Sequence, residues 1–303
     1  MKMNKEDIKR RLMTDDALFN FIYTFQQSFD VSPKNEHYGA YIDYQDIYEL
    51  REDFLDALID TIVDWVYSQE KYYKLLEIEK KNGKTDSAAA SAVQRKVKAK
   101  FRGAGSEKLL SQGQFGELLL FHFIQHCFHA VPVLRKMPIT TSSQQERFGA
   151  DAIHYKIEND KNIFILGEAK AYTTGTFNAA FKKAIGSITT TVENLRSELR
   201  LYVHEDFLDE EMNEVAEKFL NNTLKNYETH LVCIIAYNET KEITKLNELE
   251  IRKQIKKVIE ERYSKTDKGL VDLDKYPILT RMTYIVFPIW KLDEMVESFQ
   301  KML

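Results

Sequence analysis

The stretch Gly149-Ala150-Asp151-Ala152-Ile153-His154 is followed, after a polar turn, by Ile163-Phe164-Ile165-Leu166-Gly167-Glu168-Ala169-Lys170. Both halves favour β-strands, and the turn between them predicts that they pair as a hairpin. Side chains alternate across a strand, so Glu168 and Lys170 share one face while Ala169 points away. Pairing would bring Asp151 into the same volume. Two carboxylates and an ammonium group at the ends of apolar strands are costly to bury unless a further ion, a metal or an anion, balances their charge.

Strands and helices are expected on both sides of this hairpin. The run 131–134 predicts a strand at a sheet edge because it contains Pro132. The run 230–236 is apolar throughout, which is typical of a strand covered on both faces. Apolar spacing predicts helices over 115–129, 177–199 and 245–264, and a last strand over 282–287. The sequence therefore predicts an α/β fold, a mixed sheet flanked by helices.

The N-terminal third has a different character. The aromatic run 18–25 favours a strand over a buried helix. From Asp46 to Ile78, apolar residues recur every three to four positions, which predicts one amphipathic helix. A basic, alanine-rich run follows over 88–102. We therefore expect a mainly helical, partner-binding subdomain over 1–104 and the larger domain over 105–303.

Composition sets broad limits on function. The chain has 303 residues, 44% hydrophobic and 30% charged, which is typical of soluble globular proteins. No stretch is apolar enough to span a membrane, and the N-terminus is charged, so we expect a cytoplasmic protein. Cys127 and Cys233 lie in apolar runs and are expected to be reduced core thiols. A net charge of −4 argues against coating nucleic acid by bulk electrostatics, but it allows a nuclease with local basic patches.

The residues of the hairpin suit metal-assisted phosphodiester hydrolysis. A divalent cation creates a nucleophile and neutralises charge, and hard cations such as Mg²⁺ prefer oxygen ligands. Asp151 and Glu168 would supply carboxylates, and the carbonyl group of Ala169 a third oxygen. Lys170 would orient the attacking water or oppose the charge of the transition state. The alternative is a simple ion pair on a strand, but the continuously apolar run before Glu168 argues against it.

Glu117 is a further candidate, because its neighbours at helical spacing are apolar. A metal-binding or water-positioning role is expected, and a local capping role near the helix start is the alternative. Lys182, Lys183 and Arg147 are candidates for phosphate contacts, although each can equally be a solvated charge. His122, His126 and His129 are interpreted as surface or interface residues, since His122 and His126 cannot share the helix face of Glu117.

With these residues in place, the region 112–236 resembles the PD-(D/E)xK nuclease superfamily, which has the restriction-endonuclease-like fold. Ala150-Asp151 stands where that superfamily often has Pro-Asp. The phrases Gly116-Glu117-Leu118-Leu119-Leu120, Gly149-Ala150-Asp151 and Leu166-Gly167-Glu168-Ala169-Lys170-Ala171-Tyr172 are more specifically similar to the HamA family, effectors of the Hachiman anti-phage defence system.

This resemblance implies a magnesium- or manganese-dependent DNA endonuclease or nickase. Its catalytic residues would be Glu117, Asp151, Glu168 and Lys170. It further implies a partner, the superfamily 2 helicase HamB, which restrains the nuclease until aberrant or phage-associated DNA is sensed. Two alternatives stay open: RNA as the substrate, and an inactive nuclease-fold subunit that only binds DNA or serves as an adaptor of the helicase.

Overall fold

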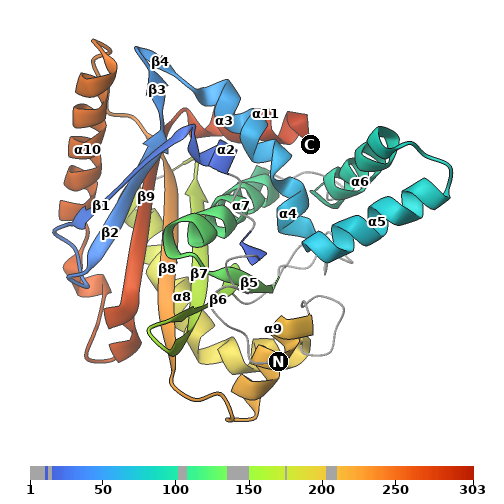
Figure 1. Ribbon diagram of the computed structural model, residues 1–303. Coiled ribbons are helices and arrows are strands. Elements are labelled where there is room, and N and C mark those ends of the chain that lie inside the picture. Colours follow the sequence, from blue (N-terminus) through green and yellow to red (C-terminus); the bar gives the residue numbers. More distant parts are fainter. Residues whose placement is uncertain (1–10, 13–15, 102–107, 135–149, 175, 203–209) are drawn as a thin grey trace.

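The hairpin forms as expected and lies within a larger sheet (Figure 1). The computed structural model describes residues 11–12, 16–101, 108–134, 150–174, 176–202 and 210–303. Strands β6 (Ala152–Glu158) and β7 (Lys161–Tyr172) pair antiparallel, with Ala152 opposite Gly167. Asn159 and Asp160 turn the chain with φ of 51° and 59°. Asn and Asp tolerate this left-handed conformation, which a two-residue hairpin turn requires.

Five further strands complete a seven-stranded mixed sheet in the order β1-β2-β9-β8-β7-β6-β5. The pairs β2–β9, β9–β8 and β8–β7 are parallel, and the others are antiparallel. The strand that contains Pro132 is at the sheet edge, as predicted. These strands are β1 (Ile22–Ser28), β2 (Glu36–Ile42), β5 (Val131–Leu134), β8 (Tyr227–Glu239) and β9 (Met282–Trp290).

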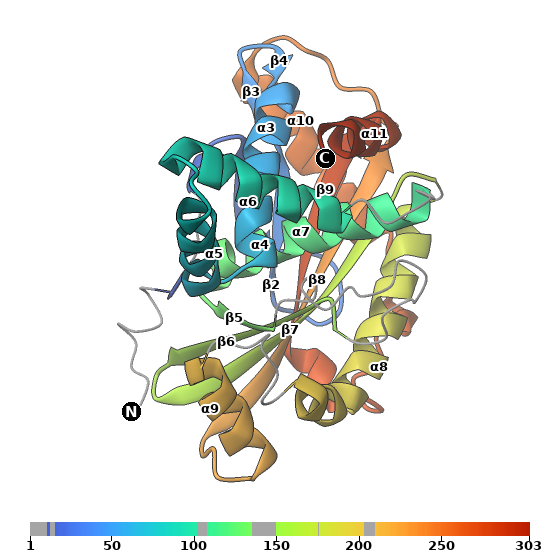
Figure 2. The same ribbon diagram turned by 90° about the vertical axis from the view of Figure 1, so that its right-hand side faces the viewer.

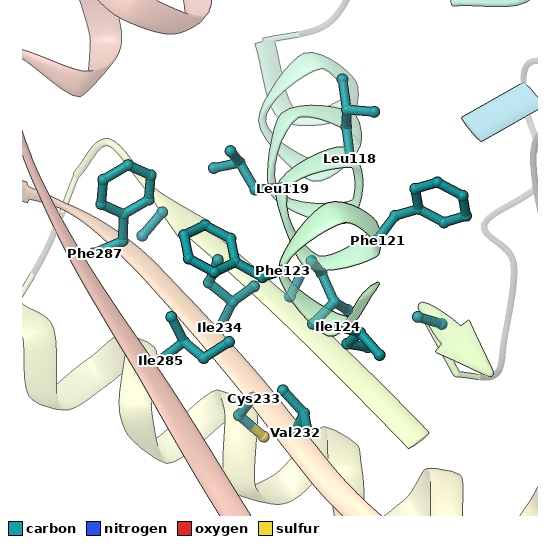
Figure 3. Close-up of a cluster of buried hydrophobic side chains, with 14 of the residues drawn as sticks. Leu118, Leu119, Phe121, Phe123, Ile124, Val232, Cys233, Ile234, Ile285 and Phe287 are labelled. Atoms are coloured by element: carbon teal, nitrogen blue, oxygen red, sulfur yellow. The ribbon is translucent and has the colours of Figure 1, made fainter. Parts of the chain in front are cut away.

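Helices cover both faces of the sheet (Figure 2). On one side, here called the α7 face, α7 packs over β7 and β8, and Phe123 lies edge-on to Phe287 with ring centroids 5.9 Å apart (Figure 3). On the other, the α8 face, Phe181 lies 4.9 Å from Tyr284. The α7 face carries α7 (Lys108–Phe128), α3 (Arg51–Asp60) and α11 (Leu292–Met302), and the α8 face carries α8 (Phe177–Tyr202), α9 (Glu210–Leu220) and α10 (Glu248–Ser264).

The single helix expected between Asp46 and Ile78 is wrong. A two-stranded hairpin, β3 (Tyr44–Gln45) and β4 (Tyr48–Glu49), comes first, followed by α3, α4 (Ile62–Val66) and α5 (Gln69–Lys81). Ser68 has an extended backbone, and its Oγ accepts a hydrogen bond from the N–H of Lys71 at 3.2 Å. This N-cap starts a new helix in the middle of a sequence whose apolar spacing does not change.

The N-terminal third shares its core with the rest of the chain. The run 18–25 begins with the last two residues of a helical turn, α2 (Asp16–Phe19), and ends within β1, so the expected strand begins only at Ile22. Strand β2 pairs with β9 near the opposite end of the sequence. Helix α6 (Asp86–Phe101) ends just before residues 102–107, which lie outside the described residues together with the expected boundary at 104. None of the helices in the described part of the chain could cross a membrane.

Candidate functional site

Glu168 and Lys170 lie near the C-terminal end of β7 and form an ion pair there. The side chain of Glu168 is 5% exposed and that of Lys170 is 22% exposed. A carboxylate this deep in a protein needs a partner, because burying an isolated charge is strongly unfavourable. Lys170 supplies that partner and still reaches solvent. The pair expected from the alternation of side chains is therefore present, and it is largely buried.

Asp151 reaches the same short segment from the neighbouring strand. Its backbone N–H donates to the carbonyl oxygen of Gly167 at 3.0 Å, and its Oδ2 accepts a hydrogen bond from the N–H of Ala169 at 2.9 Å. The carboxylate thus takes the place of a backbone acceptor at the point where β6 begins. The structure brings Asp151, Glu168 and Lys170 together at one end of the hairpin.

The two sides of β7 have different neighbours. A Cβ built on Gly116 of α7 would lie 3.5 Å from the Cβ of Ala169, so Ala169 points to the α7 face. Alternation along the strand turns Glu168 and Lys170 to the α8 face. Cys233, which pairs with Glu168 across the parallel strands, is buried there. The charged pair therefore lies between β7 and the layer that contains α8.

The ionisation of Lys170 reflects two opposing effects. Burial alone lowers the pKa of its ammonium group, but the Glu168 charge, the hydrogen bond to Glu168 and the Asp151 charge outweigh burial, and the pKa ends above its ordinary value. Burial, with a smaller effect of Glu168, raises the pKa of the Cys233 thiol well above its ordinary value. Lys170 is therefore a cation at neutral pH, and Cys233 is a neutral thiol behind it.

Glu117 lies on a different layer from the charged pair. It is half-buried on α7, next to Gly116, and so over the α7 face at the level of Ala169 and Ala171. Strand β6 begins only opposite Gly167, so among the described residues β7 has no strand neighbour beyond that point on this side. A side chain from α7 could approach Asp151 only over this open edge. A shared role for Glu117 stays a prediction.

Two carboxylates of the charged cluster are candidate ligands for a hard cation. Within the described residues, no three His, Cys, Asp or Glu side chains are grouped so that they could hold a metal ion. Mg²⁺, however, is commonly held by one or two carboxylates together with water and substrate phosphate oxygens. Asp151 and Glu168 provide those two carboxylates. Ala169 and Glu117 stay predicted as additional ligands.

The predicted phosphate contacts fall into two groups. Lys182 and Lys183 are exposed on the second turn of α8, whereas Arg147 lies outside the described residues. Lys183 Nζ lies over the ring of Tyr172, 5.2 Å from its centroid. Tyr172 is two positions after Lys170 and so on the same face of β7, a period-2 relationship that sequence reasoning could have used but did not. Lys183 and Tyr172 together border the charged pair.

The expectation that the α7 histidines are surface or interface residues is wrong for His122, which lies in the core. This side chain is 1% exposed, and burial lowers its pKa to about 3, so it is neutral and belongs to the core. His126 stacks on Phe19 with ring centroids 3.7 Å apart. Only His129, at the end of α7, is exposed. The apolar pattern of this helix could not predict which of its histidines would be buried in the core.

Fold and site together define a mixed α/β protein with a buried carboxylate–lysine cluster near the end of a central strand. The family model of HamA matches residues 16–303, almost the entire chain. The chain therefore belongs to the HamA family, as its motifs predicted, and membership indicates a component of the Hachiman defence system. A search among curated proteins gives no match.

Proposed function

We propose that this protein is a metal-dependent DNA nuclease, an endonuclease or nickase that hydrolyses phosphodiester bonds. The observation that carries the proposal is the convergence of Asp151, Glu168 and Lys170 at one end of the β6–β7 hairpin. Membership of a defence-effector family supports it. The restriction-endonuclease-like architecture is part of the proposal, and a mixed sheet with helices on both faces is compatible with it.

Each residue has a role that its position allows. Asp151 and Glu168 would hold Mg²⁺ or Mn²⁺, which supplies charge neutralisation and an acidified water when bound. Asp151 is held in place by the Ala169 N–H, so one of its oxygens is oriented. Lys170, kept cationic by both carboxylates, would stabilise the developing negative charge on the phosphate. Glu117 would position water from the α7 side.

The site can be tested with a charge-specific variant. Purified protein, with and without its helicase, is incubated with supercoiled plasmid and Mg²⁺. Glu168→Gln should abolish nicking while the protein stays folded, as circular dichroism and its unfolding midpoint check, because the amide keeps the shape and can still accept a hydrogen bond from Lys170. Glu193→Gln, on the exposed side of α8, is the control and should cleave normally. Full cleavage by Glu168→Gln would refute the site.

A DNA-binding or adaptor subunit that has lost its chemistry is the alternative. A purely structural ion pair between Glu168 and Lys170 would have the same geometry. Metal-independent DNA binding with no turnover, alone or with helicase, would favour this alternative. A labelled RNA of the same sequence in the same assay decides between the two nucleic acids as substrate.

A helicase partner that restrains the nuclease is also proposed, on the basis of family membership. The N-terminal part is the expected contact region, but deleting it is not a usable test. Strands β1 and β2 belong to the main sheet, and Phe54 of α3 packs edge-on against Phe287 at 6.1 Å. Exchange of exposed side chains in the intact chain, followed by co-purification with the helicase, tests the contact without removing the core.

A further inference from the structure

Helices α5 and α6 form a hairpin that projects from the body of the protein (Figure 1). We call residues 69–101 the arm. Helix α6 is anchored through buried Ala92, Val93 and Val97, and it packs against α4. Helix α5 has one buried side chain, and that is a carboxylate, Glu79. A helix that contributes no buried apolar side chain is not explained by the needs of the core.

The arm carries a charge opposite to that of the rest of the chain. It has nine Lys or Arg residues and four Asp or Glu residues, a net charge of +5, within a chain of net charge −4. The other residues together therefore carry −9. Charge segregation of this size is unexpected for an ordinary solvated surface, on which the two signs are mixed.

Glu79 holds the hairpin together. Its carboxylate, with a side chain 5% exposed, forms ion pairs with Lys84 of the turn and Lys96 of α6. These hydrogen bonds, from Lys84 and from Lys96, lower the pKa of Glu79 to about 2, so the clamp stays charged at neutral pH. The two helices are thereby fixed relative to each other, and a rigid support presents the other cations.

Several cations of the arm are not used inside the protein. Glu70, Glu77 and Asp86 pair with Lys74 and Lys80. By contrast Lys71, Lys81 and Arg95 are exposed and form no ion pair within the part of the chain that the structure describes. Lys71, Lys74, Ile78 and Lys81 lie within one 80° sector of α5 at 100° per residue, and Ile78 is 50% exposed. This sector therefore carries three lysines and one exposed apolar side chain.

We infer that the arm is a binding surface for the phosphate backbone of nucleic acid, separate from the carboxylate–lysine cluster. Spaced lysines on a rigid helix fit a polyanion of regular charge spacing and need no base contact. The inference rests on the proposed function only in taking nucleic acid as the ligand. An arm that binds DNA away from the charged cluster would also allow an acidic protein to act on nucleic acid, because it concentrates the positive charge in one place.

The test measures binding without chemistry. The full-length triple variant Lys71→Gln, Lys81→Gln, Arg95→Gln is compared with wild type by fluorescence anisotropy of a labelled DNA duplex, in EDTA and over a series of salt concentrations. The control removes three exposed cations from α10 and its end, as Lys253→Gln, Lys257→Gln, Lys265→Gln. The arm variant should bind at least about tenfold more weakly, and its slope of log K against log salt should fall by about 2 to 3. The control should keep the wild-type slope.

Three results would overturn the inference: wild-type protein that does not bind the duplex, equal losses in the arm and control variants, or an arm variant that binds DNA normally but no longer co-purifies with the helicase. The last would assign the arm to an acidic protein partner. The binding assay contains no free divalent cation, so its result does not depend on the nuclease. Arm-dependent binding in this assay, without cleavage of plasmid in the Mg²⁺ assay, would refute the nuclease and support the arm as a binding surface. Cleavage of plasmid together with binding that does not depend on the arm would refute the arm and support the nuclease.

Discussion

Asp151 accepts a hydrogen bond from the backbone N–H of Ala169 at 2.9 Å, so its side chain is fixed to the residue that lies between Glu168 and Lys170. This single contact places the first carboxylate relative to the other two charged groups. It also ends the β6–β7 ladder with a side chain instead of a main-chain carbonyl. The position of Asp151 is thus both structural and, in the proposed function, chemical.

The two roles of Asp151 can be separated. Asp151→Asn keeps an oxygen that accepts the Ala169 hydrogen bond but removes the charge, so we expect lost cleavage and an almost unchanged free energy of unfolding. Asp151→Ala leaves the N–H without this acceptor and should lower the free energy of unfolding by about 1 to 2 kcal/mol. Urea unfolding and plasmid nicking measure the two effects. Equal stability losses in both variants would contradict a structural role for the hydrogen bond.

The close packing of α7 on the hairpin predicts a steric effect at Gly167. A Cβ there would lie 2.8 Å from Leu120 Cδ2, 2.8 Å from Ile124 Cδ1 and 3.1 Å from Ala152 Cβ. Gly167→Ala should therefore destabilise the protein by about 1 to 3 kcal/mol, because the core must shift.

Gly186 provides the matched control for this steric effect, since a Cβ on this exposed residue of α8 would meet nothing within 4 Å. Gly186→Ala should stabilise the protein by about 0.4 to 1 kcal/mol. Both changes are measured as differences in unfolding free energy by urea titration. A neutral Gly167→Ala would contradict the predicted steric effect and would mean that the Leu120 and Ile124 side chains make room for the new methyl group.

The neighbouring lysines of α8 should differ in their effect on DNA binding. Lys183 is held over the Tyr172 ring beside the site, whereas Lys182 points about 100° around the helix from it. Lys183→Ala should reduce the slope of log K against log salt by about 1, and Lys182→Ala by less. Tyr172→Phe keeps the ring and should bind normally, while Tyr172→Ala should reproduce part of the Lys183→Ala loss. Equal changes of the salt slope in the two lysine variants would contradict a role of Lys183 and Tyr172 in binding DNA beside the charged pair.

His37 should make folding stability depend on pH. Its Nε2 bonds to the carbonyl oxygen of Pro33 at 2.9 Å, and its Nδ1 accepts from the N–H of Tyr284 at 3.2 Å, so the buried ring is neutral and joins β2 to β9. Burial lowers its pKa from 6.5 to about 4 despite the Pro33 contact. The unfolded chain therefore binds a proton at pH values where the folded protein does not, and stability falls as the pH drops from 6.5 towards 4.

Between pH 7.5 and 5 this effect of His37 amounts to about 2 kcal/mol. His37→Gln does not titrate and places an amide near the position of Nε2, so its unfolding free energy should change less over this range, as measured by urea denaturation. His129→Gln, at an exposed position, should keep the wild-type pH dependence. The same pH dependence in His37→Gln and wild type would mean that another group is responsible.

Local patterns were sufficient to predict the hairpin and the pairing of its charges. Strand preference, a turn sequence that accepts left-handed φ and strict alternation are properties of neighbouring residues, so Glu168 and Lys170 could be placed on one face from the sequence alone. The edge position of the strand with Pro132 and the buried β8 followed in the same way. The motifs around these residues also predicted the HamA family.

Tertiary structure decided what depends on distant partners. Helical periodicity shows that α7 has an apolar side but not which face of the sheet that side covers, so the layer of Glu117 could not be predicted. The break at Ser68, the burial of His122 and the parallel pairing of β2 with β9 depend in the same way on contacts made after collapse. The sequence by itself therefore determined the identity of the charged cluster, because its geometry is local. Only the fold decided which side chains border that cluster. Contacts between the sheet and the helix layers connect residues that are far apart in the sequence, and no regular spacing in the sequence predicts them.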